Sequence, residues 1–283
     1  MIIVADSGST KTDWRIYDKK HGIRQLQTIG MNPYFLNSDK VTEVLEKDLL
    51  PYLNPKNVGE VYFYGSGCTL SEKVREIEYP LSDLFTEATI AVESDLLGTA
   101  RALCGNSAGL IGILGTGSNS CIYDGRYITK QINSLGYVLG DEGSGAILGR
   151  SLVKAFFENK LPVDLEKDFF EKHPVSLSRT LDMIYRQSFP NMFLASFAPF
   201  AFQHKTNPWM KELLNSHFEA FFTHMVTVYE DYRQFTLHLS GSIAHYFGEF
   251  VEEAAKNHRI ALGRIIIQPV DDILNYHIQQ HSE

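Results

Sequence analysis

Two short turns rich in glycine and hydroxyl side chains are the segments of this sequence best suited to hold phosphate groups. The first is DSGST at Asp6–Thr10, and the second is GTGSN at Gly115–Asn119. Glycine allows successive backbone amides to converge on an anion, and the hydroxyl groups add further donors. Each turn alone could be an ordinary hairpin turn. As a matched pair, each directly after an apolar segment, they favour phosphate binding, and the first turn offers Gly8, Ser9, Thr10 and Lys11 as candidate contacts.

Carboxylates near these turns could serve phosphoryl transfer. That reaction needs an acceptor hydroxyl in line with the phosphate, a group to take its proton, and Mg²⁺ to neutralise the phosphates. Asp95 follows the apolar run Thr89–Val92 and precedes a helical segment, so it is either the proton acceptor or an N-cap of that helix. Asp6 either orients Mg²⁺ through water or caps its own turn. Farther along, GDEGSG at Gly140–Gly145 either binds ligand hydroxyl groups or starts a helix.

Two other nucleotide-binding motifs are absent from the sequence. The pair Lys11-Thr12 lacks the glycine spacing of a P-loop. No predicted strand leads into G-x-G-x-x-G with a later acidic partner, which argues against a dinucleotide-binding fold.

The elements that must position these residues alternate between strands and helices. The stretch ADSGSTKTDWRIYD from Ala5 reads as strand, turn and strand, and LGTGSNSCIYDG from Leu114 repeats that order and again reaches Ile-Tyr-Asp. A duplicated supersecondary unit is the economical interpretation. The alternation predicts an α/β fold whose sheets are covered by helices. We place the boundary near Ala108, which gives an N-terminal domain of residues 1–108 and a C-terminal domain of residues 109–283 with a helical insertion.

Apolar spacing predicts where the individual elements lie. The expected strands are Ile2–Ala5, Asp13–Tyr17, Ile23–Thr28, Val58–Tyr64, Thr89–Val92, Gly109–Leu114, Ser120–Tyr123, Arg126–Ile132, Thr236–Leu239 and Arg264–Gln268. Helices are expected at Lys40–Leu50 and Leu96–Leu103, through most of the segment from Gly145 to about Tyr232, after the turn Ser240–Ser242, and at the C-terminus.

Composition excludes several classes of partner. The net charge of −8 argues against a nucleic-acid partner, because such proteins carry a basic face. Cys68, Cys104 and Cys121 are an odd number without tight spacing, which is unlike a disulfide framework or a zinc site. The N-terminus reaches a charge at Asp6, too early for a signal peptide, and no apolar run is long enough to span a membrane. We therefore expect a cytoplasmic protein without a membrane partner; a homodimer is compatible with the sequence.

Several blocks of sequence resemble one known family. They are Asp6–Thr10, Ser94-Asp95, LGTGSNS from Leu114, GYVLGDEGSGAILG from Gly136, and LSGSIAHYF from Leu239. Together they resemble the N-acetylglucosamine kinase branch of the BadF/BadG/BcrA/BcrD ATPase family, within the actin/Hsp70/sugar-kinase superfamily. The resemblance spans nearly the full length, and its middle three blocks are the most specific. It implies two actin-like (ribonuclease H-like) domains with a nucleotide cleft between them, ATP and Mg²⁺ as cofactors, and a small sugar as substrate.

The resemblance also implies roles for individual residues. Asp95 matches the catalytic base of the family, which favours that role over capping. Matches to nucleotide contacts fall on Thr10, Thr116, Gly117, Ala195, Gly241 and Ser242. Matches to sugar contacts fall on Asn32, Asn119, Ser134, Leu135, Gly136 and Asp141. The turn after Val58–Tyr64 adds Gly65 and Ser66 as candidate substrate contacts.

One segment departs from the family pattern. Where the family often has glycines and a tryptophan, this sequence has Ser134-Leu135-Gly136. The expected reaction is transfer of a phosphoryl group from ATP to an amino sugar, N-acetylglucosamine at its 6-hydroxyl. Because of this departure, glucosamine or another hexosamine derivative is the alternative acceptor.

An ATP-driven activator of the BadF type would hold an iron–sulfur cluster through cysteines, which the spacing of the three cysteines does not favour. A nucleotide-sensing or cytoskeletal protein on the same fold is disfavoured by the matches to sugar contacts.

Overall fold

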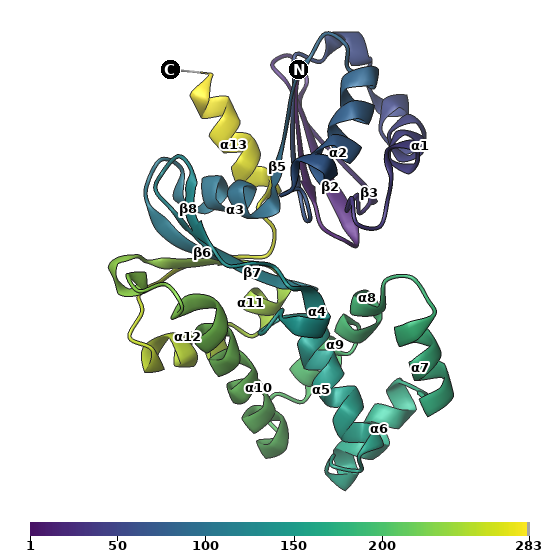
Figure 1. The fold of residues 1–283 in the computed structure, drawn as a ribbon, viewed down its shortest axis with the longest axis vertical. Helices are drawn as coiled ribbons and strands as arrows, with labels where there is room; N and C mark the ends of the chain where they lie inside the picture. Colours follow the sequence, from purple (N-terminus) through teal and green to yellow (C-terminus); the bar gives the residue numbers. More distant parts are fainter. Residues whose placement is uncertain (282–283) are drawn as a thin grey trace. The chain divides into compact units, whose positions relative to one another are not determined.

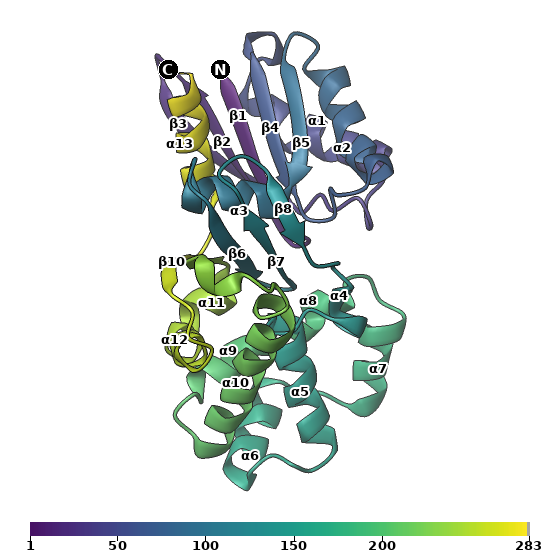
Figure 2. The ribbon, with the colours of Figure 1, turned by 60° about the vertical axis from the view of Figure 1, so that its left-hand side comes forward.

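Two five-stranded sheets with the same strand order carry the two phosphate turns (Figures 1 and 2). In this computed structural model, which describes residues 1–281, the first sheet has the order β3-β2-β1-β4-β5. The second has the order β8-β7-β6-β9-β10, so each strand of the first sheet has a counterpart in the second. This correspondence supports the duplication predicted from the sequence.

The strands lie close to their predicted positions. In the first sheet they are β1 (Ile2–Ser7), β2 (Lys11–Asp18), β3 (Gly22–Ile29), β4 (Glu60–Gly65) and β5 (Thr89–Ser94). In the second sheet they are β6 (Gly109–Leu114), β7 (Ser118–Tyr123), β8 (Ile128–Gln131), β9 (Leu237–Ser240) and β10 (Leu262–Ile266).

The chain divides into two units, and the division differs in part from the predicted domains. Unit 1 contains residues 1–108, residues 123–128 and the described residues from Gln268 onward; unit 2 contains residues 109–122 and 129–267. The predicted second domain contained everything after residue 108. The C-terminal helix instead belongs to unit 1, because its apolar side chains Val270, Ile273 and Leu274 are buried in that unit's core.

Unit 1 is a sheet covered by helices on both faces (Figure 1). One face packs on α1 (Ser38–Asp48) and α2 (Ser71–Leu84), and the other on α3 (Asp95–Cys104) and α13 (Val270–Gln280). Alternation along β1 explains how one strand serves both faces: Ile3 and Ala5 enter the first core and Val4 the second. The helix α2 was not predicted, and it tolerates Pro80 in its interior.

Unit 2 combines its sheet with a large helical part, as predicted for the segment after Gly145. The helices are α4 (Gly136–Leu139), α5 (Gly145–Phe157), α6 (Val163–Lys172), α7 (Leu177–Tyr185), α8 (Pro190–Ala195), α9 (Ala198–Gln203), α10 (Pro208–Phe221), α11 (Ser242–Tyr246) and α12 (Gly248–Asn257). Figure 2 shows α5, α9 and α10 gathered beside one another, and buried phenylalanines such as Phe200, Phe218 and Phe221 fill the core that they share with the sheet. Among residues 1–281, no helix combines the length and apolar character needed to cross a membrane.

Candidate active site

The first phosphate turn lies between β1 and β2 in unit 1. The Gly8 amide donates to the Lys11 carbonyl at 3.0 Å and closes the turn. The Ser7 hydroxyl accepts the Met31 amide at 3.0 Å. Gly30 packs so closely against the turn that a Cβ on it would lie 2.3 Å from the Gly8 carbonyl oxygen. The segment after β3 therefore holds the turn in one conformation.

Asn32, a predicted sugar contact, links this turn to the chain that follows it. Its Nδ2 donates to Ser9 Oγ at 3.1 Å, and its Oδ1 accepts the Tyr34 amide at 2.9 Å. The side chain is buried. An amide side chain has two N–H groups and two acceptor lone pairs. Beyond these two bonds, Asn32 can therefore still offer a donor and an acceptor to a ligand beside the phosphate turn.

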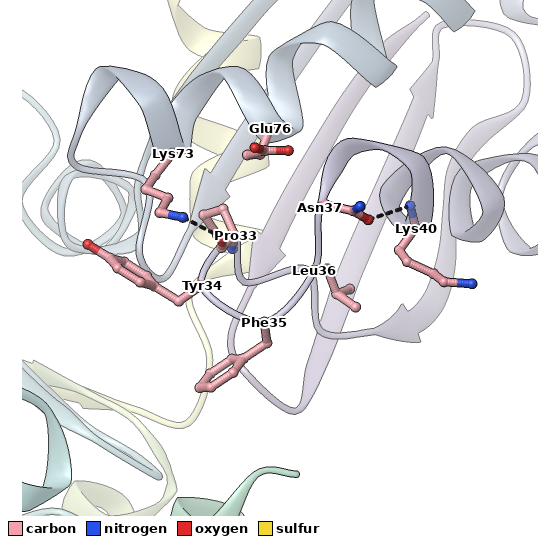
Figure 3. A pocket seen from close by; sticks show the side chains of 8 residues that line it. All are labelled: Pro33, Tyr34, Phe35, Leu36, Asn37, Lys40, Lys73 and Glu76. Atoms are coloured by element: carbon pink, nitrogen blue, oxygen red, sulfur yellow. Dashed lines mark hydrogen bonds between the residues drawn. The ribbon is translucent and has the colours of Figure 1, made fainter.

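A pocket of about 310 Å³ opens directly after Asn32 (Figure 3). Its lining consists of Pro33, Tyr34, Phe35, Leu36, Asn37, Lys40, Lys73 and Glu76. Lys73 Nζ donates to the Pro33 carbonyl at 3.3 Å and lies 5.0 Å from the centre of the Tyr34 ring. The rings of Tyr34 and Phe35 are exposed. Two exposed aromatic side chains therefore lie in the segment that follows Asn32.

Asp6, at the end of β1, lies in an acidic environment. It is directly opposite Asp13 in the antiparallel ladder of β1 and β2. Burial raises the pKa of Asp6 to about 7, and the negative charges of Asp95 and Asp13 act in the same direction, whereas the charge of Lys11 lowers it. An additional positive charge at this place would therefore stabilise the ionised form of Asp6.

The side chain of Lys11 forms an ion pair with Asp13. Its Nζ lies 2.7 Å from Asp13 Oδ2 and donates to Gln268 Oε1 at 3.1 Å. The ammonium has three donors, so these two contacts leave one for a ligand, and the phosphate contact of Lys11 stays a prediction. Asp13 was not singled out from the sequence as a neighbour of Asp6. The hairpin nevertheless indicates it, because the two residues are equally far from the centre of the turn. Residues placed in this way face each other in a regular antiparallel pair.

Asp95 is the first residue of α3 and follows the end of β5. Ser94 is the N-cap of this helix, because its hydroxyl accepts the Leu97 amide at 3.2 Å. Burial raises the pKa of Asp95 to about 6, while hydrogen bonds from the Leu96 amide and the Ser66 side chain lower it. The capping role considered for Asp95 thus falls to Ser94, which leaves the Asp95 carboxylate available for chemistry.

Gly65 and Ser66, the candidate substrate contacts from the turn after β4, lie alongside the first phosphate turn. Gly65 is paired with Ser7 in the parallel ladder of β1 and β4, and the Ser66 amide donates to the Ser7 carbonyl at 2.8 Å. Unit 1 therefore brings together these two residues, the first phosphate turn and Asn32, and it brings Asp6 and Asp95 within electrostatic reach of each other.

The second phosphate turn follows β6 in unit 2. The Gly115 amide donates to the Gly117 carbonyl at 2.9 Å. The carbonyls of Gly115 and Thr116 accept the amides of Gly145 and Ala146 at 2.8 and 3.1 Å. These bonds attach the turn to the first residues of α5.

The other predicted nucleotide contacts in unit 2 lie around this turn. Gly241 has φ = 117°, and a Cβ on it would lie 2.2 Å from the Leu114 carbonyl oxygen, so only glycine fits. Ser242, the next residue, begins α11. A Cβ on Gly145 would lie 3.3 Å from the Ala195 Cβ. The chain thus brings Ala195, Gly241 and Ser242 to the same place as the second turn.

Asp141 lies in the acidic turn, which we define as Gly140–Gly145. It adopts a left-handed backbone with φ = 61°, which is uncommon for a residue other than glycine. Burial raises the pKa of Asp141 to about 6, the Ser118 amide lowers it by donating to the carboxylate, and the Glu142 charge raises it. A Cβ on Gly117 would lie 3.0 Å from Asp141 Oδ2, so this carboxylate lies against the second phosphate turn.

The alternative role of the acidic turn, starting a helix, belongs to another residue. Ser144 caps α5, with its hydroxyl accepting the Ile147 amide at 3.3 Å. The carboxylates of Asp141 and Glu142 are therefore not needed as caps.

The remaining predicted sugar contacts of unit 2 lie next to the acidic turn or the second phosphate turn. A Cβ on Gly140 would lie 3.3 Å from the Leu135 Cβ, so the segment Ser134–Gly136 runs beside the acidic turn. The Leu135 side chain is 57% exposed and could contact a ligand. Asn119, on β7, accepts the amide of Ser120 through its own Oδ1 at 2.8 Å, which leaves its Nδ2 as the group to offer to a ligand.

Comparison with known proteins decides the family. No protein-family model matches the sequence, and no curated protein does. Among solved structures, a candidate N-acetylglucosamine kinase from Porphyromonas gingivalis is 37% identical, with a TM-score of 0.94 over 99% of this chain and 100% of that one. The chain belongs to the N-acetylglucosamine kinase-like family of sugar kinases. The kinase therefore has the two-domain actin-like fold that the sequence predicted.

More distant structures share the fold of the kinase. A candidate N-acetylglucosamine kinase from Chromobacterium violaceum is 17% identical, with a TM-score of 0.76 over 97% of the kinase and 98% of that chain. A glucokinase of the ROK family from Streptomyces griseus, solved in complex with glucose and AMPPNP, is 11% identical with a TM-score of 0.55 over 99% and 98% of the two chains.

The cysteines of the kinase do not resemble ligands of a shared cluster. Cys68 and Cys121 are both buried. Burial raises the pKa of Cys68 to about 12, which disfavours the thiolate that binds iron. These observations weigh against the iron–sulfur activator considered from the sequence.

Proposed function

We propose that the kinase transfers the γ-phosphoryl group of ATP to the 6-hydroxyl of N-acetylglucosamine, with Asp95 as the general base. The observation that carries this proposal is the state of the Asp95 carboxylate. Ser94 caps α3, so the Asp95 carboxylate does not serve as the cap. Burial raises the pKa of this carboxylate to about 6. Such a group is mostly ionised at neutral pH and still basic enough to accept a proton from an attacking hydroxyl.

Phosphate binding is proposed for the two turns. In unit 1, the amide and hydroxyl groups of Gly8–Thr10 would hold phosphate oxygens, and in unit 2 Thr116 and Gly117 would do the same. Gly241 and Ser242, with Ala195, would contact the adenosine. The support is the close packing that fixes each turn, because a site that is rigid before binding loses little entropy on binding.

Magnesium fits the chemistry of unit 1. Mg²⁺ usually keeps several waters and takes one or two carboxylates together with substrate phosphates. Among residues 1–281 no three acidic, histidine or cysteine side chains form a complete metal cage, which suits an ion held partly by ATP. Asp6 would orient the hydrated ion. Burial and the neighbouring carboxylates disfavour the ionised form of Asp6, and the positive charge of the ion would stabilise that form. Bound there, Mg²⁺ would neutralise charge on the β- and γ-phosphates.

The proposed reaction proceeds by a single displacement. Asp95 accepts the proton of the sugar hydroxyl as that oxygen forms a bond to the γ-phosphorus. The bond between the γ-phosphorus and the bridging oxygen breaks, and ADP leaves with the electron pair. Asn32, Asn119 and Asp141 would hold the sugar hydroxyls, which fixes the acceptor oxygen in line.

The identity of the sugar is tested by a panel of acceptors. Sugar-stimulated ADP release is measured with N-acetylglucosamine, glucosamine, glucose and 6-deoxy-N-acetylglucosamine. We expect the highest kcat/KM with N-acetylglucosamine and no stimulation by the 6-deoxy analogue, because it lacks the acceptor. A preference for glucosamine would make glucosamine the substrate in place of N-acetylglucosamine. The unusual Ser134–Gly136 segment would explain that outcome. Absence of stimulation by every hexosamine would overturn the proposal.

The pH dependence of the reaction follows from the pKa of Asp95. Because the base must be ionised and its pKa is about 6, we expect kcat/KM for the sugar to be nearly constant above about pH 7. Below about pH 6 it should fall roughly tenfold for each pH unit. The measurement is a profile of kcat/KM at saturating ATP, with circular dichroism at each pH to confirm that the fold is retained. A profile without an acid limb between about pH 5 and about pH 7 would exclude Asp95 as the base.

A further inference from the structure

The acidic turn has a backbone that needs support from outside. Two of its residues, Asp141 and Gly143, have positive φ angles, 61° and 84°. A left-handed conformation at a residue other than glycine persists only when the surrounding structure holds it. The Ser118 amide holds the carboxylate of Asp141 at one end of this turn. The Ser118 hydroxyl also donates to the Glu142 carbonyl at 2.8 Å, and the Ser144 amide donates to the Asp141 carbonyl at 3.1 Å. Gly143 is supported by a different element.

Helix α10 provides that support through two residues one turn apart. His217 and Phe221 are spaced i, i+4, so their side chains lie on the same face of the helix. Phe221 packs directly under the turn, since a Cβ on Gly143 would lie 2.6 Å from the Phe221 Cβ. His217 is 6% exposed, and its ring makes a hydrogen bond with the backbone of Gly143.

The chemistry of the ring fixes the direction of this bond. Within residues 1–281, Nε2 of His217 has no hydrogen-bond partner, so the bond to Gly143 uses Nδ1. Burial lowers the pKa of His217 to about 4, so the ring is neutral, and the bond to the Gly143 backbone opposes that change. A neutral ring with Nδ1–H donates to the Gly143 carbonyl. The imidazole is thus a fixed donor beneath the turn rather than a titrating group at neutral pH.

We propose that His217 is a positioning residue for substrate binding, acting through the Gly143 carbonyl to hold Asp141 in its left-handed conformation. The proposal rests on the function proposed above for Asp141 and names a residue that touches neither sugar nor nucleotide. Without the imidazole, the Gly143 carbonyl would be buried without its donor, and the turn would move to find another. A displacement of about 1 Å in a binding carboxylate is enough to weaken a site strongly.

Three variants separate positioning from general stability. His217→Leu keeps an apolar side chain of similar size and removes the donor. His217→Asn keeps a donor near the position of Nδ1. His173→Leu is the matched control, because His173 also packs among phenylalanines of unit 2, with its ring against Phe169, Phe197 and Phe200.

The first readout is hydrogen–deuterium exchange in the unliganded full-length protein. In His217→Leu we expect amides of the acidic turn to exchange about tenfold faster than in the unsubstituted protein, which corresponds to the loss of about one hydrogen bond. His217→Asn should restore most of the protection, and His173→Leu should leave this turn unchanged. Wild-type exchange of the acidic turn in His217→Leu, or equal acceleration in His173→Leu, would overturn the proposal.

The second readout is kinetic. We expect His217→Leu to raise KM for the amino sugar about tenfold with a change of less than about twofold in KM for ATP. His217→Asn should recover most of the sugar affinity. Equal changes in both KM values would contradict a role specific to Asp141. If the unsubstituted protein shows no sugar-dependent turnover, the proposed function fails, and the exchange measurement still decides whether His217 positions the turn.

Discussion

Replacing Asp95 with asparagine should lower kcat by about 10²–10⁴-fold, which is the usual contribution of a positioned general base. Asparagine has the same shape but cannot accept the proton of the sugar hydroxyl. The helix α3 should be unaffected, because Ser94 and not Asp95 is its N-cap. The affinity for ATP should be retained, since the phosphate turns are unchanged.

The measurements are kcat from coupled ADP release, thermal unfolding, and binding of a nucleotide analogue. Asp124→Asn is the matched control, because Asp124 is also an aspartate at a turn but accepts the amides of Arg126 and Tyr127 away from the residues assigned to the site. It should turn over normally. An Asp95→Asn protein that folds and keeps a kcat within about threefold of the unsubstituted value would remove Asp95 from the mechanism.

Replacing Gly30 with alanine should raise KM for ATP at least tenfold and lower kcat. The new methyl group would lie 2.3 Å from the Gly8 carbonyl oxygen and 2.5 Å from the Ser9 carbonyl carbon. Neither neighbour is a flexible side chain, so the first phosphate turn itself must shift. Overpacking of this kind costs about 1–3 kcal/mol. We therefore expect moderate destabilisation together with loss of phosphate alignment.

Gly248→Ala is the control for this change. Gly248 begins α12, and a Cβ there would meet no atom within 4 Å. Alanine also has the higher helix propensity, so this variant should be at least as stable as the unsubstituted protein and fully active. The two proteins are compared by steady-state kinetics over a range of ATP concentrations. An unchanged KM for ATP in Gly30→Ala would show that the first turn does not bind the nucleotide.

Much of the fold could be predicted because its strands are apolar and its turns are marked by glycine. The predicted strand at Gly109–Leu114 has the same bounds as β6. The repeated strand–turn–strand pattern predicted a duplicated unit, and the equal strand order of the two sheets supports it. The predicted helix Lys40–Leu50 begins two residues earlier, at Ser38, because Asn37 caps it. The helix α2 was missed, since Pro80 in its interior reads as a breaker, although its ring is buried against the core.

The candidate site was only partly readable, because side-chain partners depend on contacts distant in sequence. Residue types and spacing left Asp95 as either a cap or a base, and only the resemblance to the family favoured the base. The hydrogen bond from the Leu97 amide to the Ser94 hydroxyl shows that Ser94 is the cap. Lys11 donates to Gln268, which lies 257 residues away in the sequence. No motif in the sequence links these two residues. His217 has no motif at all, since nothing near it indicates that its ring reaches the Gly143 backbone.

The place of α13 has a consequence for synthesis on the ribosome. This helix, from the C-terminal end of the chain, joins the first strands through Arg15 Nη2 and Asp271 Oδ2 at 3.0 Å and through Tyr64 and His277 at 2.8 Å. Residues 1–108 emerge long before α13 is made, and at about 5–20 residues per second the delay is on the order of ten seconds. During that interval one face of the first sheet lacks the helix that covers Val4. Unit 2 can complete its core before α13 is made, so unit 1, whose first strands precede unit 2, is completed after unit 2.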